Sequence, residues 1–304
     1  MFSLRIQGFC GAVHLRSQLG PSFVPGRTQI DLSGLRYAEP ITLVAIAALA
    51  EAALADGQQV LCVPPDDPGV AGYLAHMGLD EALSRIGVHL SLPPVTGRTL
   101  RDTLTEITWF DSATRIEQLA IMVHGALERI DLDAANALFS GIMESGANVI
   151  EHSGRRGGFL VAQLIRKRTQ LQFAVSDSGV GMLQTLRGVG AETHAQALHL
   201  ALQRGISENP QRGSGIGLYD MNDEILRLGG ALQIISGNAV LWSQPERQRV
   251  TVWPTEGPGT CLQGLIPLRR REKPQATPIP GIIRDGMTTG VCREAQRCRH
   301  AEAV

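Results

Sequence analysis

ESGANVIEH at residues 144–152, DSGVG at 177–181 and RGSGIG at 212–217 are the three stretches from which the fold of this sequence can be worked out. The first belongs to a helical pattern, the second follows a strand pattern, and the third precedes a second helical pattern. Each stretch is weak evidence by itself, because polar helix stripes, Asp-x-Gly turns and lone glycine loops are all common. Their combination and order are what is specific.

The first stretch lies on a helix predicted over 134–151. One face is apolar, whereas Glu144, Asn148 and His152 recur every four residues and form a polar stripe. Taken alone, such a stripe is usually the solvated side of an amphipathic helix. The alternative places it under a nucleotide, where the Asn148 oxygen would ligate Mg²⁺ and the Glu144 carboxylate would activate water or a hydroxyl.

The second stretch comes directly after an apolar strand predicted at 171–176. The carboxylate of Asp177 can accept a hydrogen bond from an adenine amino group. Gly179 and Gly181 have no Cβ, so a purine could approach the backbone closely. The simpler interpretation of the same residues is an ordinary turn.

The third stretch opens a helix predicted over 216–228, with a buried stripe at Leu218, Met221, Ile225 and Leu228. Backbone amides of a glycine loop at a helix N-terminus form a phosphate site. A Rossmann site is excluded because no strand precedes the glycines and the spacing is not G-x-G-x-x-G. Neither G-x-x-x-x-G-K-[ST] nor H-R-D occurs, which excludes the common ATP folds. The candidate phosphate ligands are Arg212, Gly213, Ser214, Gly215, Ile216 and Gly217.

Together these stretches resemble the N, G1 and G2 boxes of the GHKL ATPase superfamily, and Gly259-Thr260 resembles its last strand. The resemblance covers 105–268 and implies the Bergerat fold, a two-layer α/β sandwich that binds ATP and Mg²⁺. It implies that Asn148 holds Mg²⁺, that Asp177 binds adenine, and that residues 183–211 form a mobile lid. The glycines of the third stretch, Gly213, Gly215 and Gly217, would hold the phosphates.

Within that superfamily, Glu144 with Asn148 and His152 looks most like the anti-sigma-factor serine kinases, whose glutamate at this position is the base. A sensor histidine kinase would instead carry a phospho-accepting histidine. His124 lacks the S-H-E-L-R-like setting of such a residue, so we expect it at a packed helix boundary.

The N-terminal part predicts a small α/β unit, with strands at 3–7, 28–32 and 59–63 and helices at 41–56 and 69–77. Residues 29–80 resemble a STAS domain, as in IDLSGLRYAEPITLVAIAAL at 30–49, so residues 1–95 are interpreted as a STAS-like domain. Phosphorylatable STAS domains carry a Ser or Thr pair after the acidic residue. Here Ile41 stands at the acceptor position and Thr42 one place later, which indicates a docking module that is not phosphorylated.

Charge and composition exclude several other classes of protein. A net charge of −1 provides no basic field for nucleic acid. The longest apolar run, 41–55, contains Glu51 and is shorter than the roughly 20 residues that span a bilayer, so it predicts a buried helix. Five cysteines without a C-x-x-C pair and no signal-peptide pattern favour the cytoplasm. Residues 269–304 are rich in Arg, Pro and Gly and are predicted to be disordered.

The sequence therefore predicts an ATP- and Mg²⁺-binding signalling protein of the α/β class, acting in a partner-switching pathway as a serine/threonine protein kinase or a slow ATPase. Its partner would be a STAS-domain or sigma-factor-like protein, and a homodimer stays open. The alternative is a non-catalytic switch, in which lid closure over the nucleotide controls which protein docks.

Overall fold

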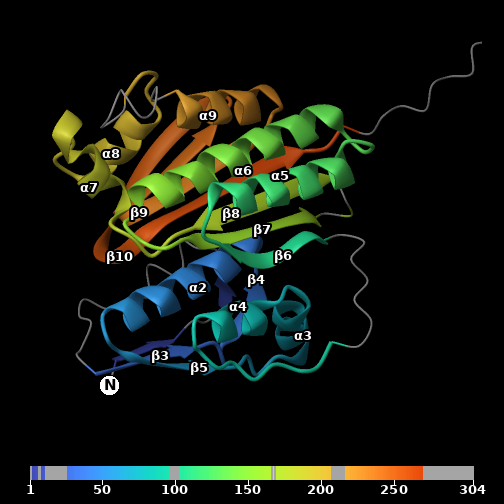
Figure 1. Ribbon diagram of the computed structural model, residues 1–304, viewed down its shortest axis with the longest axis vertical. Coiled ribbons are helices and arrows are strands. Elements are labelled where there is room, and N and C mark those ends of the chain that lie inside the picture. The colour runs from blue at the N-terminus through green and yellow to red at the C-terminus, as the bar shows by residue number, and fades with distance from the viewer. Residues whose placement is uncertain are drawn as a thin grey trace, which may run out of the picture. The chain divides into compact units, whose positions relative to one another are not determined.

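The computed structural model describes residues 2–5, 8–10, 26–95, 103–165, 167, 169–206 and 216–269, all within one compact unit, Met1–Arg271. The architecture is mixed α/β (Figure 1). Arg212, Gly213, Ser214 and Gly215 of the glycine loop lie outside the described residues, as does the tail from 270 for which disorder is predicted.

The larger sheet has five antiparallel strands in the order β6-β7-β8-β10-β9. The sequence predicts a hairpin of strands at 159–165 and 171–176, which is confirmed as β7 and β8. It also predicts separate strands at 250–253 and 260–266, which is wrong, because β10 runs through both with register shifts around Gly257. The strand β6 was not predicted, and shifts around Thr105 interrupt the regular alternation that would have revealed it. The bounds are β6 Thr103–Phe110, β7 Gly158–Ile165, β8 Gln170–Ser176, β9 Ala231–Gln244 and β10 Arg247–Pro267.

Three helices, α5 (Ala113–Leu127), α6 (Leu132–His152) and α9 (Gly217–Arg227), cover one face of this sheet (Figure 1). The Asp131 side chain caps α6 by accepting from the Ala134 amide at 3.1 Å. The predicted buried stripe of α9 is confirmed at all four positions. For α5 the sequence predicts a buried stripe at Leu119, Met122, Val123, Ala126 and Ile130. That prediction is wrong in part, because Met122 is 49% exposed and the buried side runs through Ile116, Leu119, Ala120, Val123 and Leu127.

The N-terminal part contains the predicted strands and helices together with some that were not predicted. Its main sheet is parallel, in the order β1-β3-β5, and β2 pairs with β4 in a separate parallel ribbon. Strand β4 and helix α4 were missed because both are very short. The bounds are β1 Phe2–Arg5, β2 Gly8–Cys10, β3 Arg27–Asp31, β4 Leu35–Ala38, β5 Gln59–Val63, α3 Pro68–His76 and α4 Leu79–Arg85.

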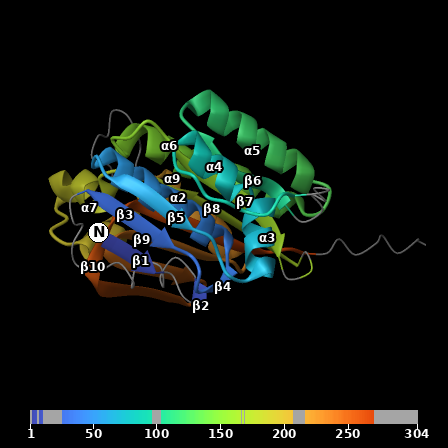
Figure 2. The same ribbon diagram turned by 90° about the horizontal axis from the view of Figure 1, so that it is seen from below.

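Helix α2 (Pro40–Ala55) joins the two parts, and thirteen of its 16 residues are buried. It lies between the small parallel sheet and the second face of the large sheet (Figures 1 and 2). Ile46 of α2 shares a core cluster with Phe159 and Val161 of β7, whereas the alternate residue Leu160 belongs to the cluster under α6. The large sheet is therefore buried on both faces, and the predicted buried helix at 41–55 is confirmed.

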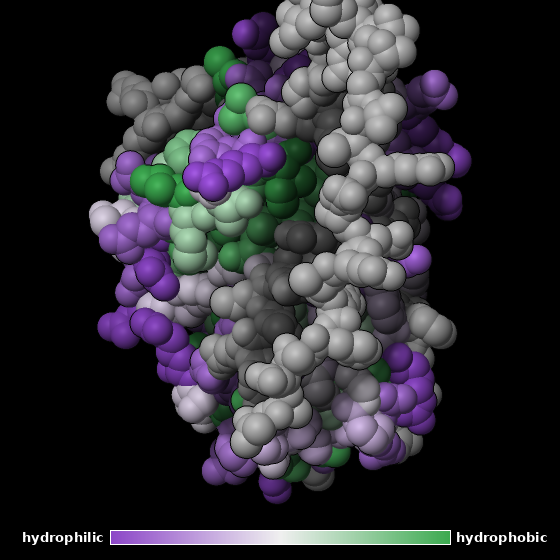
Figure 3. Space-filling model, turned by 90° about the vertical axis from the view of Figure 1, so that its right-hand side faces the viewer, coloured by the Kyte–Doolittle hydropathy of each residue, from purple (hydrophilic) through white to green (hydrophobic). Residues whose placement is uncertain are grey.

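The surface carries few large apolar side chains. Figure 3 shows the side of the molecule at the right of Figure 1, where an apolar area lies among hydrophilic residues. None of the helices in the described ranges is long and apolar enough to span a membrane. The exposed large hydrophobic residues among those described are Tyr37, Leu61, Ile121, Met122, Leu132, Val180 and Val252.

Candidate functional site

A cavity of about 300 Å³ lies between α6, the turn after β8, helix α7 (Gly181–Leu186) and the start of α9. It brings together residues from all three sequence stretches, which are far apart along the chain. The residues of these stretches that line the cavity include Glu144, Asn148, Asp177, Gly181 and Gly217. The size suits a small-molecule ligand, and the walls combine apolar side chains with a few polar groups, as binding sites do.

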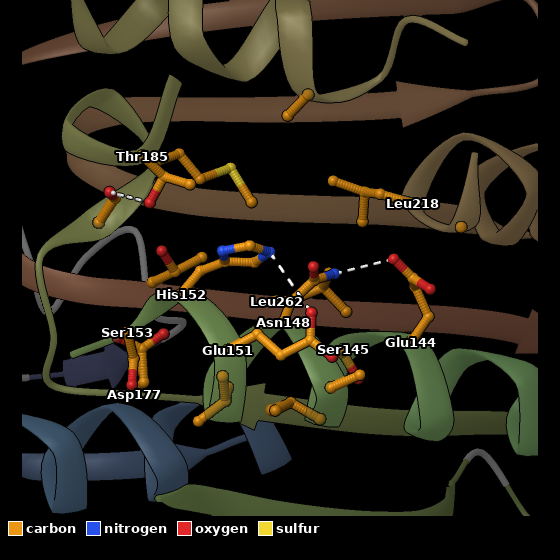
Figure 4. Close-up of a pocket in the computed structure, with 18 of the residues that line it drawn as sticks. Glu144, Ser145, Asn148, Glu151, His152, Ser153, Asp177, Thr185, Leu218 and Leu262 are labelled. Atoms are coloured by element: carbon orange, nitrogen blue, oxygen red, sulfur yellow. Dashed lines mark hydrogen bonds and ion pairs between the residues drawn. The ribbon is translucent and has the colours of Figure 1, made fainter. Parts of the chain in front are cut away.

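The polar stripe of α6 faces this cavity. Glu144, Asn148 and His152 project from the helix to the same side (Figure 4). The Asn148 amide nitrogen donates to Glu144 Oε1 at 3.0 Å, and His152 Nε2 lies 3.8 Å from Glu151 Oε2. The stripe therefore lines a cavity, with its side chains half-buried. The hydrogen bond also directs the Asn148 oxygen away from the carboxylate, which leaves it suited to a cation.

Glu144 is partly withdrawn from solvent. Burial raises the pKa of its carboxyl group, while the hydrogen bond from Asn148 acts in the opposite direction and the negative charges of Glu151 and Asp220 add to the increase. The start of α9 lies against it, since a Cβ on Gly217 would come within 1.8 Å of Glu144 Oε2. A side chain at 217 would therefore displace the Glu144 carboxylate, a consequence that the sequence did not reveal.

The Asp177 turn is held by a dense set of backbone hydrogen bonds. The Asp177 amide donates to the Thr260 carbonyl at 3.0 Å, and the Gly259 amide donates to the Gly179 carbonyl at 2.9 Å. Asp177 Oδ1 accepts from the Gly179 amide at 2.7 Å. The Asp177 side chain is only 5% exposed. Because so many bonds fix the turn, the carboxylate is presented to the cavity with little freedom.

Two glycines at this turn are required by close backbone contacts. A Cβ on Gly179 would lie 1.9 Å from the Ser153 carbonyl oxygen. Gly259 has φ +60°, and a Cβ there would lie 1.9 Å from the Asp177 carbonyl oxygen. The described residues that line the cavity include Gly181 but not Gly179 or Ile216. The sequence stretch therefore combines a residue that faces the cavity with one that shapes the turn.

The segment predicted to be a lid forms α7, a short 3₁₀ turn at Arg187–Val189 and α8 (His194–Ala201), and its residues 207–211 lie outside the described part. It has a small apolar cluster of its own, separate from the main core. The Met182 amide donates to Ser236 Oγ at 2.8 Å and anchors the start of α7. The lining residues from this segment carry no sequence signal that could have identified them: Met182, Thr185, Leu186, Ala201 and Ile206.

The side chains that line the cavity offer oxygen ligands and, from His152, an imidazole nitrogen. No cluster of three or more His, Cys, Asp or Glu residues that could hold an ion occurs within the described ranges. A site of one amide oxygen completed by phosphate oxygens and water suits Mg²⁺, which is seldom caged by protein alone. His124 is a residue of α5 that packs against α6, as expected, with its Nε2 3.0 Å from Asn136 Oδ1.

Comparison with known proteins adds little. No protein-family model matches the chain, and no curated protein matches its sequence. Among solved structures, a mycobacterial sensor histidine kinase, MprB, is similar at a TM-score of 0.31 and 19% identity, over 54% of this chain and 98% of that chain. A likeness at this level is too weak to indicate a function, and the geometry of the cavity is the stronger guide.

Proposed function

We propose that this chain binds ATP with Mg²⁺ in the cavity above α6 and acts as a GHKL-type signalling protein, phosphorylating a serine or threonine of a partner protein or hydrolysing ATP slowly. One observation carries the proposal. The three stretches that resemble the N, G1 and G2 boxes contribute Glu144, Asn148, Asp177, Gly181 and Gly217 to one cavity. Their convergence is not required by local structure, since residues 144 and 217 lie on different helices.

The residues present fit the ligand. Asp177 is a buried acceptor at one end of the cavity, beside the backbone of Gly181. Its carboxylate would accept a hydrogen bond from the adenine amino group. The start of α9 lies at Gly217, close to Glu144, where phosphates would meet the positive end of a helix. Asn148 lies between the two and would hold the cation. Bound Mg²⁺ would supply charge neutralisation at the phosphates.

Glu144 is the proposed base. Its carboxylate lies one helical turn from Asn148 and accepts a hydrogen bond from it, which fixes its orientation. A base works best when its pKa is raised toward the working pH, and burial raises the pKa of Glu144 in that direction. Its role is to take the proton of a water molecule or a hydroxyl held at the phosphate end.

In this proposal the hydroxyl that accepts the phosphoryl group belongs to another protein. Ile41 and Thr42 are fully buried at the start of α2, and the Thr42 hydroxyl oxygen accepts from the Glu39 amide at 3.2 Å. Phosphoryl transfer needs an acceptor in line with the phosphate, which a buried capping residue cannot provide. We therefore propose that residues 1–95 form a STAS-like domain that docks a partner protein and does not accept a phosphoryl group. Residues 105–268 would form the GHKL-type domain.

A nucleotide-dependent switch without chemistry is the second candidate. The separate apolar cluster of Leu186, Ala191 and Ala197 favours it, because a segment with its own small core can move as a unit over a ligand. Single-turnover measurements with ATP, with and without partner proteins, separate the two candidates. Release of phosphate or phosphorylation of a partner favours catalysis, and bound but unchanged ATP favours the switch.

Calorimetric titration with ATP and Mg²⁺ tests the site itself. Asp177→Ala should weaken binding by about tenfold or more, since a lost acceptor leaves a buried donor of the ligand unpaired, at a cost of about 1–3 kcal/mol. The matched control is Asp111→Ala, which removes an exposed carboxylate. Equal affinity of Asp177→Ala and the control would show that the adenine assignment is wrong.

A further inference from the structure

Glu51 is the one charged residue in the sequence of α2, and its side chain contacts the turn beside the candidate site. Glu51 Oε2 accepts a hydrogen bond from Ser178 Oγ at 2.8 Å. Ser178 lies inside the DSGVG turn, immediately after Asp177, and is only 1% exposed. A residue of the N-terminal part is therefore bonded to the turn that presents Asp177 to the cavity.

Arg155 holds the same serine from another direction. Its Nε donates to the Ser178 carbonyl at 3.1 Å, and it belongs to the connection between α6 and β7. Burial raises the pKa of Glu51, while the Ser178 hydroxyl and the positive charge of Arg155 act against that increase. A half-buried carboxylate in an otherwise apolar helix is costly unless it is bonded and paired. Glu51 thus faces the turn and also the Trp109 side chain of β6, which likewise acts against the increase in its pKa.

We propose that Glu51 is a positioning residue for the nucleotide site: through Ser178 it holds the Asp177 turn in its binding shape, so that α2 of the N-terminal part sets the affinity for ATP. The proposal rests on the proposed function for the identity of the ligand. The contact between Glu51 and the turn does not depend on it.

Coupling of this kind works in both directions. A change in α2 that moves the Glu51 carboxylate would loosen Ser178 and weaken nucleotide binding. Nucleotide bound at Asp177 would in turn stabilise the position of α2 by the same free energy. Because α2 also packs in one core with Ile30 and Leu35 of the N-terminal part, this part has a direct physical route to the site.

Four variants of the full chain test the proposal: Glu51→Ala, Glu51→Gln, Ser178→Ala and the exposed control Glu117→Ala on α5. Each is measured by calorimetry with ATP and Mg²⁺ and, without nucleotide, by hydrogen exchange at the Gly179 and Val180 amides. Glu51→Ala should weaken ATP binding about tenfold and speed exchange at the turn by a similar factor, since a buried hydroxyl loses its acceptor. Glu51→Gln keeps an acceptor oxygen and should stay within about threefold of wild type.

Ser178→Ala should reproduce Glu51→Ala, and the double variant should be no weaker than either single variant, because both remove the same bond. The proposal is overturned if Glu51→Ala behaves like Glu117→Ala in both measurements. It is also overturned if exchange rises equally throughout the protein, which would indicate loss of general stability. If the wild type binds no ATP yet exchange at the turn alone responds to Glu51→Ala, the positioning role stands and the proposed function fails.

Discussion

Helices α2 and α6 cover opposite faces of the same sheet, yet they differ in how many polar residues they carry and in where these residues point. Helix α2 is apolar around its whole circumference and has Glu51 as its one charge. Helix α6 buries one side and presents Glu144, Asn148 and His152 to a cavity on the other. A helix that is apolar all round joins two layers, whereas an amphipathic helix leaves one side for chemistry.

The two half-buried glutamates, Glu51 and Glu144, show the same contrast on a smaller scale. Burial raises the pKa of both Glu51 and Glu144. Glu51 is satisfied by a serine hydroxyl and the charge of Arg155, which suits a structural carboxylate. Among the described residues, the Asn148 amide donates a hydrogen bond to Glu144, and the acidic groups of Glu151 and Asp220 lie nearby, which suits a carboxylate that must exchange a proton.

The largest effect that should separate the helices is on stability. Ile46→Ala in α2 should lower the free energy of unfolding by about 2–5 kcal/mol, because Ile46 is fully buried between the sheets. Ile121→Ala on α5 is the matched control, since Ile121 is 58% exposed and should change stability by less than about 0.5 kcal/mol. Urea unfolding followed by circular dichroism measures both. Similar losses for the two variants would mean that α2 is not a shared core element.

An effect on catalysis should be confined to α6. Glu144→Gln should lower turnover by about 100-fold, the usual contribution of a positioned base, while ATP affinity stays within a few-fold. Glutamine preserves the shape and can still accept from Asn148, but it cannot take a proton. Asn148→Ala should lower affinity as well as turnover, because it removes the proposed cation ligand. Single-turnover kinetics and calorimetry give the two quantities separately.

Full turnover in Glu144→Gln with intact binding would contradict the role of Glu144 as a base. The switch without chemistry would then explain the site better. If Glu51→Gln lowered turnover as much as Glu144→Gln, the two glutamates would not have different roles. Glu51 contacts the turn and not the phosphate end, so this result is not expected.

The smallest effect is the pH dependence of stability. Burial raises the folded-state pKa of Glu144 above its ordinary value of 4.5, so its protonated form is favoured by folding. The resulting stability is present below about pH 4.5 and is lost as the pH rises through the folded-state pKa. Thermal midpoints of Glu144→Gln should therefore match wild type near pH 4 and exceed it near pH 8. A difference between the two proteins that is the same at both pH values would contradict this.

Local patterns in the sequence were enough to predict most elements and some of the residues that line the cavity. The apolar stripe of α9, the hairpin of β7 and β8 and the buried helix at 41–55 all follow from hydrophobic periodicity. The order of the three stretches was enough to predict that Glu144, Asn148 and Asp177 meet at one site, and the cavity does bring them together. Their roles in binding ATP stay predictions.

How the parts depend on one another became visible only in the folded chain. The position of α2 between two sheets, the contact of Glu51 with Ser178 and the approach of Gly217 to Glu144 join residues far apart in the chain. Hydrophobic periodicity reports which side of an element is buried, but not which element buries it. Such pairings depend on the packing of whole layers, and a carboxylate in an apolar helix gives no indication of the hydroxyl that it will meet.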